Sequence, residues 1–250
     1  MNAKSAIAAI NQAGALLVFP LDNRDEPESL WSHFYPEEDM AWEWDEDGDD
    51  RVGKLWHLRG DLSTTRKVVY TKWFRGRATY LSRPIFTALL RALNPMGPGL
   101  AERAALSADA RKILVILEGE SPLSTKELKR QADLAGRANE GAYGRALKEL
   151  WSRLLIVAFG EVEDGAFPSL AIGATRVLYE DLWEEAFSLT SVDAEGQAAQ
   201  VLGRASLFFK HYAKLRAAID AGSKAAGAKE TSGKKRRGPK IGSVIRFEDL

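Results

Sequence analysis

The 250-residue chain contains no cysteine and only three histidines. The lack of cysteine excludes disulfides, thiol nucleophiles and thiolate zinc sites. The histidines, His33, His57 and His211, stand apart from one another without a ligand-spaced partner, so none is assigned to a metal. A phosphate-binding glycine-rich loop and a nucleophile elbow are both missing as well. We therefore expect no metal and no cofactor.

Long hydrophobic runs are also scarce. The most apolar segment, Ala6 to Leu21, is too short to cross a bilayer and contains Asn11, Gln12 and Gly14. It also lacks a small-residue cleavage signature after a basic start. We expect a cytoplasmic protein without a membrane partner, long enough for two or more compact units.

The formal net charge is zero, but the charges are distributed unevenly. In residues 1–50 acidic side chains far outnumber the basic ones, which are Lys4 and Arg24, whereas in residues 201–250 basic side chains predominate. This asymmetry assigns phosphate binding to the middle and the C-terminal part of the chain. The acidic run from Asp45 to Asp50 resembles the start of a calcium loop. It lacks the glycine and the final glutamate of an EF-hand, so a solvated loop is expected.

Proline and glycine residues indicate where the chain divides into domains. Asn94 to Gly99 holds two Pro and two Gly in six residues, which cannot continue a helix or a strand. We predict a winged-helix-like domain over 1–93, a linker over 94–100, a central winged helix over 101–187, a C-terminal helical segment over 188–220 and a flexible basic tail over 221–250.

The N-terminal domain is expected to contain helices, a short strand and a hairpin. The helices span Lys4 to Gln12, Asp50 to Leu62 and Pro84 to Leu93, and the strand follows Gly14. The hairpin spans Lys67 to Leu81 and turns at Arg75-Gly76.

The central segment predicts three helices and then a second hairpin. The first helix runs from Ser107 to Glu118, and the second begins with a capping box between Ser124 and Glu127. The third starts near Asn139, with an apolar stripe of Tyr143, Leu147, Leu150 and Trp151. Strands at Leu154 to Phe159 and Leu170 to Ile172 flank a turn at Glu163-Asp164-Gly165. The fold class is therefore α+β and mainly helical, with tandem winged-helix (helix-turn-helix plus β-hairpin) units.

After this hairpin we expect a helix from Tyr179 to Phe187 and one long helix from Ala194 to Ile219. Beyond Asp220 the composition of Ala, Gly, Lys and Ser cannot bury a core, so that part is expected to be mobile.

In helix-turn-helix proteins the second helix of the motif enters the major groove of DNA. Here we expect the early residues Arg137, Asn139, Glu140 and Tyr143 to meet base edges, with Arg145 and Lys148 as further DNA contacts. An alternative is that the domain pairs with a protein, since a fold does not determine a function. The hairpin turn contains the acidic residues Glu161, Glu163 and Asp164. These side chains would repel phosphates and therefore favour the protein-pairing alternative.

Two further segments are expected to contact double-stranded DNA. The first hairpin interleaves aromatic and basic side chains, including Lys72, Trp73, Arg75 and Arg77, a pattern that can stack on bases and pair with phosphates. It is equally consistent with an amphipathic hairpin whose aromatic rings are buried. The basic tail adds a charge-driven, salt-sensitive contact through Lys234, Lys235, Arg236 and Arg237.

The pieces together resemble the winged-helix DNA glycosylases of the AlkZ/YcaQ type. The similarity rests on Gly14-Ala15-Leu16-Leu17 with Ser29-Leu30-Trp31-Ser32, on Val68 to Trp73 with Tyr80 to Pro84, and on Leu147 to Val177. It covers roughly residues 5 to 185. The resemblance implies a DNA partner and a relation to DNA repair.

The resemblance fails at the catalytic signature. The family places a Gln-x-Gln or Gln-x-Asp pair after the Gly-Leu-Leu stretch to position the attacking water, but this chain has Val18-Phe19-Pro20 there. Apolar side chains neither orient nor deprotonate water. Asp22 and Asn23 lie two positions later and are the candidates to replace the pair, with Asp22 the first candidate for a relocated carboxylate.

We therefore expect a DNA-binding relative of the glycosylases and leave open whether it is an enzyme. The alternatives are an active DNA glycosylase that uses Asp22, and a winged-helix scaffold for protein interaction or transcriptional regulation. The oligomeric state is open.

Overall fold

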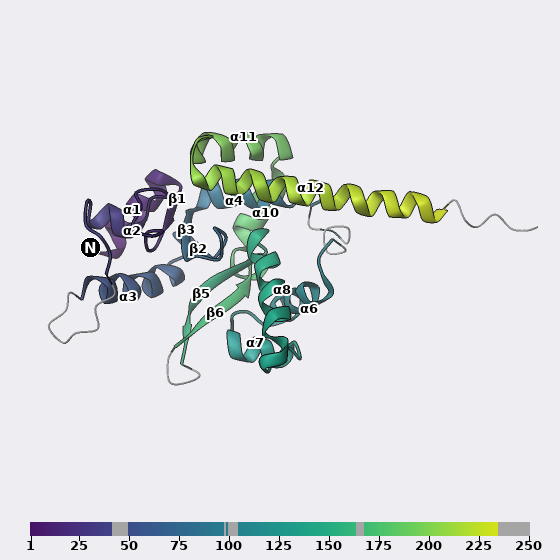
Figure 1. Cartoon of the computed structure of the whole chain (residues 1–250), viewed down its shortest axis with the longest axis horizontal. Helices are drawn as coiled ribbons and strands as arrows, with labels where there is room; N and C mark the ends of the chain where they lie inside the picture. The colour runs from purple at the N-terminus through teal and green to yellow at the C-terminus, as the bar shows by residue number, and fades with distance from the viewer. Residues whose placement is uncertain (42–49, 98, 100–104, 164–167, 235–250) are drawn as a thin grey trace, which may run out of the picture.

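The computed structural model describes residues 1–41, 50–97, 99, 105–163 and 168–234, with 223–234 described by their backbone alone. The fold is α+β and mainly helical, as predicted (Figure 1). The described strands form one antiparallel sheet in the order β1-β3-β2-β5-β6-β4. Within these residues, no helix is long and apolar enough to span a membrane.

The first part of the chain has the helices and the hairpin that its pattern predicts. Its elements are α1 (Ala3–Ala13), β1 (Ala15–Leu17), α2 (Leu30–Phe34), α3 (Arg51–Thr64), β2 (Val68–Thr71), β3 (Thr79–Ser82) and α4 (Arg83–Leu93). Helix α1 ends at Gly14, whose φ of 79° favours glycine. A β-carbon at Gly14 would lie 2.5 Å from Cγ1 of Val201, so close packing also requires the glycine.

The central part follows the predicted order as well. Its elements are α6 (Ala108–Gly119), β4 (Leu123–Ser124), α7 (Thr125–Gln131), the 3-10 turn η1 (Arg137–Asn139), α8 (Glu140–Ser152), β5 (Ile156–Val162) and β6 (Ser169–Ala174). Only half of the predicted capping box forms. Ser124 Oγ accepts from the backbone N–H of Glu127, whereas the Glu127 carboxylate accepts from Arg130 and Gln131. Charged and amide donors on the next turn of α7 outcompete the backbone N–H of Ser124.

The sheet crosses the expected linker. Tyr70 of β2 pairs with Ala158 of β5, so strands from residues 1–93 and 101–187 belong to one sheet. Asn94, at the start of the linker, is fully buried and donates to the carbonyls of Leu90 and Arg153. The Pro/Gly stretch therefore separates the two segments along the chain without separating their cores.

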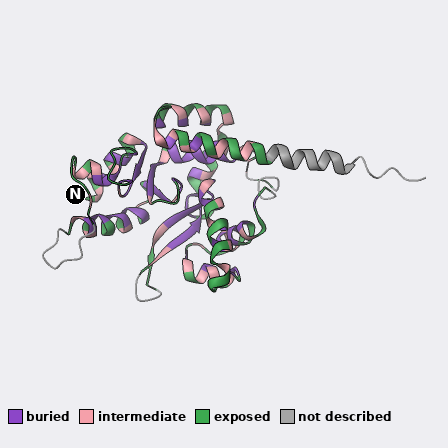
Figure 2. Cartoon of the chain, in the orientation of Figure 1, coloured by how far each residue is buried: buried purple, intermediate pink, exposed green. Residues whose placement is uncertain are grey.

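Hydrophobic cores cover both faces of the sheet, because successive strand side chains point to opposite sides. On one face Leu16, Tyr70 and Ile156 pack with α1, α3, α6 and α8. On the other face Leu17 and Val157 pack with α4 and the C-terminal helices. Figure 2 shows the buried residues concentrated on the sheet and on α4.

The C-terminal helices differ from the prediction. They are α9 (Thr175–Leu178), α10 (Glu180–Ser188), α11 (Ser191–Leu202) and α12 (Leu207–Lys234). The single helix expected from Ala194 to Ile219 is wrong, because Gly203 adopts a φ of 71° and breaks it. Ser206 Oγ then caps α12 by accepting from the backbone N–H of Phe209.

Helix α12 also continues past Asp220, where we expected a mobile tail, as far as Lys234. Alanine, lysine and glutamate in this stretch are good helix formers, and a helix can continue without burying a core. Lys235, Arg236 and Arg237 lie outside the described residues, as do Asp164 and Gly165 of the predicted turn.

Candidate nucleic-acid interface

The turn between β2 and β3 meets α12 at His211. The imidazole lies edge-on to Trp73 and Phe74, with ring centroids 5.1 Å away in each case, and its Nε2 is 3.0 Å from the backbone oxygen of Trp73. Burial lowers the pKa of His211, and the nearby positive charges of Arg75, Lys214 and Lys148 lower it further, against the hydrogen bond to Trp73. The ring is thus neutral at pH 7 and donates from Nε2 to the Trp73 carbonyl.

The charges that act on His211 define a basic cluster of Arg75, Lys148 and Lys214. They come from the turn between β2 and β3, from α8 and from α12, and all three side chains are exposed. Within the part of the chain that the structure describes, none of the three has a carboxylate partner. Sequence analysis predicted Arg75 and Lys148 but missed Lys214. Lys210 and Lys214 are one helical turn apart, and this spacing in the sequence could have indicated a basic helix face that includes Lys214.

The exposed face of α8 extends the basic cluster. Gly141, Gly144, Arg145 and Lys148 follow the i, i+3, i+4 and i+7 spacing of one stripe on α8, and all are exposed. The stripe is roughly 10 Å long at the helical rise per residue. Arg137 is exposed in η1, just before the helix. Neither Arg137 nor Arg145 makes an ion pair with another described residue.

Neighbouring cations outside this stripe are neutralised. Lys129 pairs with Glu140 at 2.6 Å and Lys112 pairs with Asp133 at 2.6 Å. Arg130 pairs with Glu127. These three cations are therefore neutralised within the chain, whereas Arg137, Arg145 and Lys148 are left to meet phosphates.

Two predicted contact residues are buried. Trp73 is 2 % exposed and stacks on Phe208, and Tyr143 is 5 % exposed beneath the Lys129 ammonium. Their rings have no free face for a base. Asn139 is half-buried, and its amide donates to the backbone oxygen of Ala135 at 3.0 Å.

A second cationic group lies on the opposite face of the β2–β3 hairpin. We call Phe19, Trp56, Arg59, Tyr70 and Lys72 the aromatic–cationic cluster. The buried Arg59 guanidinium lies 3.9 Å from the Trp56 ring centroid, and its Nη1 donates to Tyr70 Oη at 3.1 Å. The Phe19 and Trp56 rings stack with centroids 6.5 Å apart, and Trp56 is 43 % exposed.

Glu161 from β5 neutralises Arg59 through an ion pair with Nη2. Burial opposes the charge of Arg59, but Tyr70 and Glu161 together raise its pKa. Tyr80 completes the arrangement by donating its hydroxyl to the backbone oxygen of Arg59. The guanidinium is therefore held in one position between α3, β2 and β5.

Lys72 is half-buried beside this group. Burial lowers the pKa of its ammonium, and the charge of Arg59 lowers it further. No carboxylate or hydrogen-bond acceptor contacts it among the residues whose placement the structure gives. Lys72 is thus separated from Arg75, with which we had grouped it.

The segment Val18-Phe19-Pro20 runs beside the hairpin. The backbone N–H of Val18 donates to the oxygen of Ala78 at 2.9 Å. Val18 and Pro20 are buried and Phe19 is half-buried. These three side chains are apolar and offer no group to a water molecule.

Asp22 lies at the exposed tip of a tight turn. Asp22 and Asn23 have φ values of 53° and 50°, and the backbone N–H of Arg24 donates to the oxygen of Leu21 at 3.0 Å. The Asn23 amide exchanges two hydrogen bonds with the backbone of Met40. Asp22 is open to solvent, without a side-chain hydrogen bond to any described residue.

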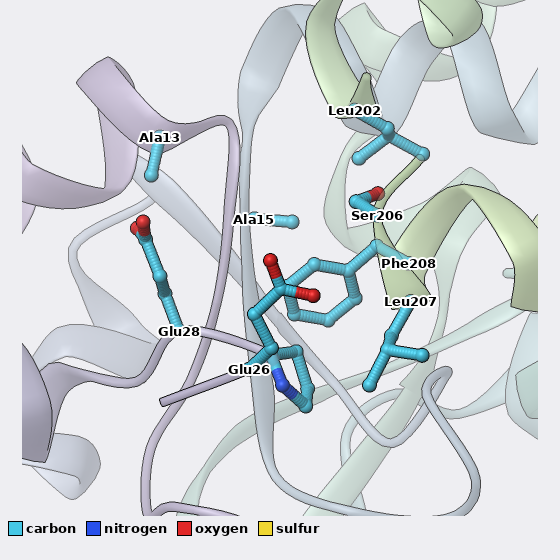
Figure 3. Close-up of a pocket in the computed structure, with 9 residues that line it drawn as sticks. Ala13, Ala15, Glu26, Glu28, Leu202, Ser206, Leu207 and Phe208 are labelled. Atoms are coloured by element: carbon cyan, nitrogen blue, oxygen red, sulfur yellow. The ribbon is translucent and has the colours of Figure 1, made fainter. Parts of the chain in front are cut away.

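A cavity of about 220 Å³ lies between the end of α1 and the α11–α12 connection. Figure 3 shows Glu26 and Glu28 projecting from one side of it and Leu202, Ser206, Leu207 and Phe208 from the other. Its two carboxylates would repel phosphates, so the cavity is not part of the nucleic-acid interface. No described residues form a His/Asp/Glu group able to hold a metal ion.

The family model described as AlkZ related matches residues 1–199, and the chain belongs to that family. The match extends from α1 into α11 and includes every strand of the sheet. No curated protein matches the chain, and no solved structure does. The predicted relationship to the AlkZ-type glycosylases is thereby confirmed.

Proposed function

We propose that this protein binds double-stranded DNA through the basic cluster and the exposed face of α8. The observation that carries the proposal is that the exposed cations Arg75, Lys148 and Lys214, from three different elements, all lower the pKa of His211. Cations without carboxylate partners on one surface gain free energy by displacing counterions from phosphates. Membership of the AlkZ-related family supports DNA as the phosphate-containing partner of this surface.

We further propose that residues 107–174 act as a winged helix with α8 as the recognition helix. The order α6, β4, α7, α8, β5 and β6 and the pairing of β6 with both β4 and β5 support this assignment. Arg137 and Asn139, in η1 just before α8, would then lie nearest the base edges. An N-terminal domain of the same type over 1–93 remains part of the proposal.

The glycines of α8 support close approach of DNA. A glycine inside a helix costs about 1 kcal/mol relative to alanine. A β-carbon at Gly144 would meet no atom within 4 Å, so packing within the chain does not require the glycine. A helix without a side chain at Gly144 allows a phosphate backbone to approach its surface, beside Arg145, whose Nη1 would lie 3.3 Å from a β-carbon at Gly141.

The acidic residues at the turn between β5 and β6 oppose DNA binding less than the sequence predicted. Glu161 is engaged by Arg59, so its charge is compensated within the protein. Glu163 is exposed. Phosphate repulsion from Glu161 therefore no longer counts against DNA binding.

We propose that the protein does not release bases by the family's water-positioning mechanism. The apolar segment Val18-Phe19-Pro20 supports this part of the proposal. An active glycosylase that uses Asp22 is disfavoured, because this carboxylate lies on an exposed turn where water fully solvates it. With DNA as the partner, we propose a cytoplasmic location.

Fluorescence anisotropy with a labelled duplex at 50 and 200 mM salt tests the proposal. The Lys148→Ala/Lys214→Ala variant should weaken binding roughly tenfold or more and reduce the salt dependence by up to about two phosphate contacts. Arg75→Ala/Arg77→Ala should act in the same direction. The matched control is Lys4→Ala/Arg24→Ala, which removes the same charge from exposed positions in the acidic N-terminal part.

The control variant should bind as the unaltered chain does. Equal losses in all three variants would show that only net charge matters, and this would refute the assigned surface. No binding by the full chain at low salt would favour the protein-interaction scaffold instead. Incubation with alkylated DNA should release no base, and release that disappears in Asp22→Ala would establish the glycosylase alternative.

A further inference from the structure

The cavity between the end of α1 and the α11–α12 connection combines apolar walls with acidic side chains at its edge. Pro27, Leu202 and Phe208 are buried residues of its walls. Glu26 and Glu28 are exposed, and their carboxylates stand apart along one side (Figure 3). The described residues that line the cavity therefore carry two negative charges, no positive charge and a mostly apolar surface.

Neither carboxylate is neutralised within the described part of the chain. Glu26 and Glu28 make no ion pair and no side-chain hydrogen bond with any described residue. Arg204, from the α11–α12 connection, lies instead against Phe209, with its guanidinium carbon 5.7 Å from the ring centroid. A cation that enters the cavity thus meets free acceptors for charge-assisted hydrogen bonds.

Phe208 gives the cavity an aromatic wall that its neighbours hold in place. Trp73 stacks on the Phe208 ring at a centroid distance of 6.4 Å, and Phe74 meets it edge-on at 5.0 Å. A planar guanidinium stacks on aromatic faces and is more weakly hydrated than an ammonium. A guanidinium therefore suits this wall better than an ammonium does.

Contacts around the cavity hold its two sides together. A β-carbon at Gly14 would lie 2.5 Å from Cγ1 of Val201, so the end of α1 packs directly on α11. The backbone N–H of Leu17 donates to the oxygen of Glu28 at 3.0 Å, and Ser206 Oγ caps α12. Because both sides are already fixed, a ligand binds there without a large cost in conformational entropy of the chain.

The volume of the cavity limits the ligand to a small group. At about 220 Å³ it is smaller than the pockets of roughly 300–1,000 Å³ that enclose drug-sized ligands. It is larger than the cavity of roughly 150 Å³ that accommodates benzene. A guanidinium on a short aliphatic stem, the size of one arginine side chain, falls between these limits.

We propose that this cavity binds a monoalkylguanidinium group. The guanidinium donates to Glu26 or Glu28, and the aliphatic stem packs against Leu202, Leu207 and Phe208. The group belongs either to a free small molecule or to an arginine side chain of a peptide, since both present the same chemistry. The cavity lies outside the DNA-binding surface, so this inference does not depend on the proposed function.

NMR titration of the isotope-labelled full chain with n-butylguanidinium tests the site. The amide signals of Ala13, Ala15 and Leu207, which line the cavity, should shift saturably at millimolar concentrations. Neutral n-butylurea has nearly the same shape and should bind at least tenfold more weakly, because it lacks the charge. Methylguanidinium should also bind at least tenfold more weakly, since each buried CH₂ group strengthens binding roughly fourfold.

Glu26→Gln/Glu28→Gln should weaken the binding of n-butylguanidinium at least tenfold, because it removes both charges and retains the size of the side chains. The matched control is Asp25→Asn/Glu37→Gln, which removes the same charge from exposed carboxylates that do not line the cavity. The control should bind as the unaltered chain does. Urea midpoints of both variants should stay unchanged, since all four carboxylates are exposed, and this measurement separates lost binding from unfolding.

The peptide acetyl-Gly-Arg-Gly-amide distinguishes the two sources of the group. Peptide binding as tight as that of n-butylguanidinium would support an arginine side chain, whereas binding of the free compound alone would support a small molecule. Equal affinities for n-butylguanidinium and n-butylurea would overturn the inference. So would equal losses in the two variants, or the lack of a saturable shift at the lining residues. Each result is obtained without DNA and leaves the proposed function as it stands.

Discussion

Replacing Gly144 by alanine should stabilise the protein and at the same time weaken its binding to DNA. Gly144 lies inside α8, and its added β-carbon would meet no atom within 4 Å. The substitution therefore creates no clash, and the helix gains about 1 kcal/mol from the higher helix propensity of alanine. For a chain of this size we expect the melting temperature to rise by roughly 2–4 °C.

The same methyl group should stand between α8 and the DNA backbone. It would displace the helix from the phosphates and lengthen a charge-assisted hydrogen bond made by a neighbour such as Arg145, a contact worth roughly 1.5–3 kcal/mol. Duplex affinity should then fall about tenfold or more. Thermal unfolding and fluorescence anisotropy on the same preparation measure both effects.

Gly196→Ala is the matched control. Gly196 lies inside α11, and its added β-carbon would likewise meet no atom within 4 Å. It should give a similar gain in stability with unchanged DNA affinity. If Gly144→Ala binds duplex as tightly as the unaltered chain, the backbone of α8 does not lie against DNA, and the argument from the glycines is refuted.

Three further predictions concern the elements that hold the two clusters. Arg59→Met should lower the free energy of unfolding by about 3 kcal/mol in urea titrations, because it leaves the Glu161 carboxylate unpaired; a loss below about 1 kcal/mol would contradict this. The pKa of His211 is lower in the folded chain than in the unfolded chain, where it is about 6.5. Its contribution to the stability of the fold is therefore fully present above that pH and is lost as the pH falls below it. The urea midpoint should therefore drop from pH 7.5 to 5.5, more in the unaltered chain than in His211→Gln, and equal drops would exclude His211 as the cause. Gly173→Ala should cost about 1–3 kcal/mol in the same titration, since its β-carbon would lie 2.2 Å from Cδ1 and 2.9 Å from Cγ of Leu178; an unchanged midpoint would show that Leu178 moves aside freely.

Local interactions were sufficient to predict most of the elements. The start of α7 at Ser124 and the hairpin of β2 and β3 depend on side chains within a few residues of each other, so a linear pattern contains the required information. That Val18-Phe19-Pro20 stands in place of a catalytic pair stays a prediction from the sequence. The split between α11 and α12 at Gly203 was missed, because apolar spacing alone does not show whether a glycine continues a helix or breaks it.

Tertiary packing decided which side chains can meet a partner. Trp73 and Tyr143 have the composition of base-stacking residues, but α12 and the neighbouring helices cover them. Lys72 and Arg75 are close in sequence, yet the strand and the turn that follows it direct them to different clusters. Side-chain direction at the end of a strand is determined by what packs on each face, and residue order does not specify it.

The basic cluster itself exists only in three dimensions. Arg75, Lys148 and Lys214 are brought together because β2 pairs with β5 and because His211 fixes α12 to the hairpin turn. Each of these contacts joins segments separated by many residues, and their free energy depends on cores that form only when the whole sheet is covered. The sequence therefore specified the charges and the local elements, while long-range packing decided that the charges form one surface.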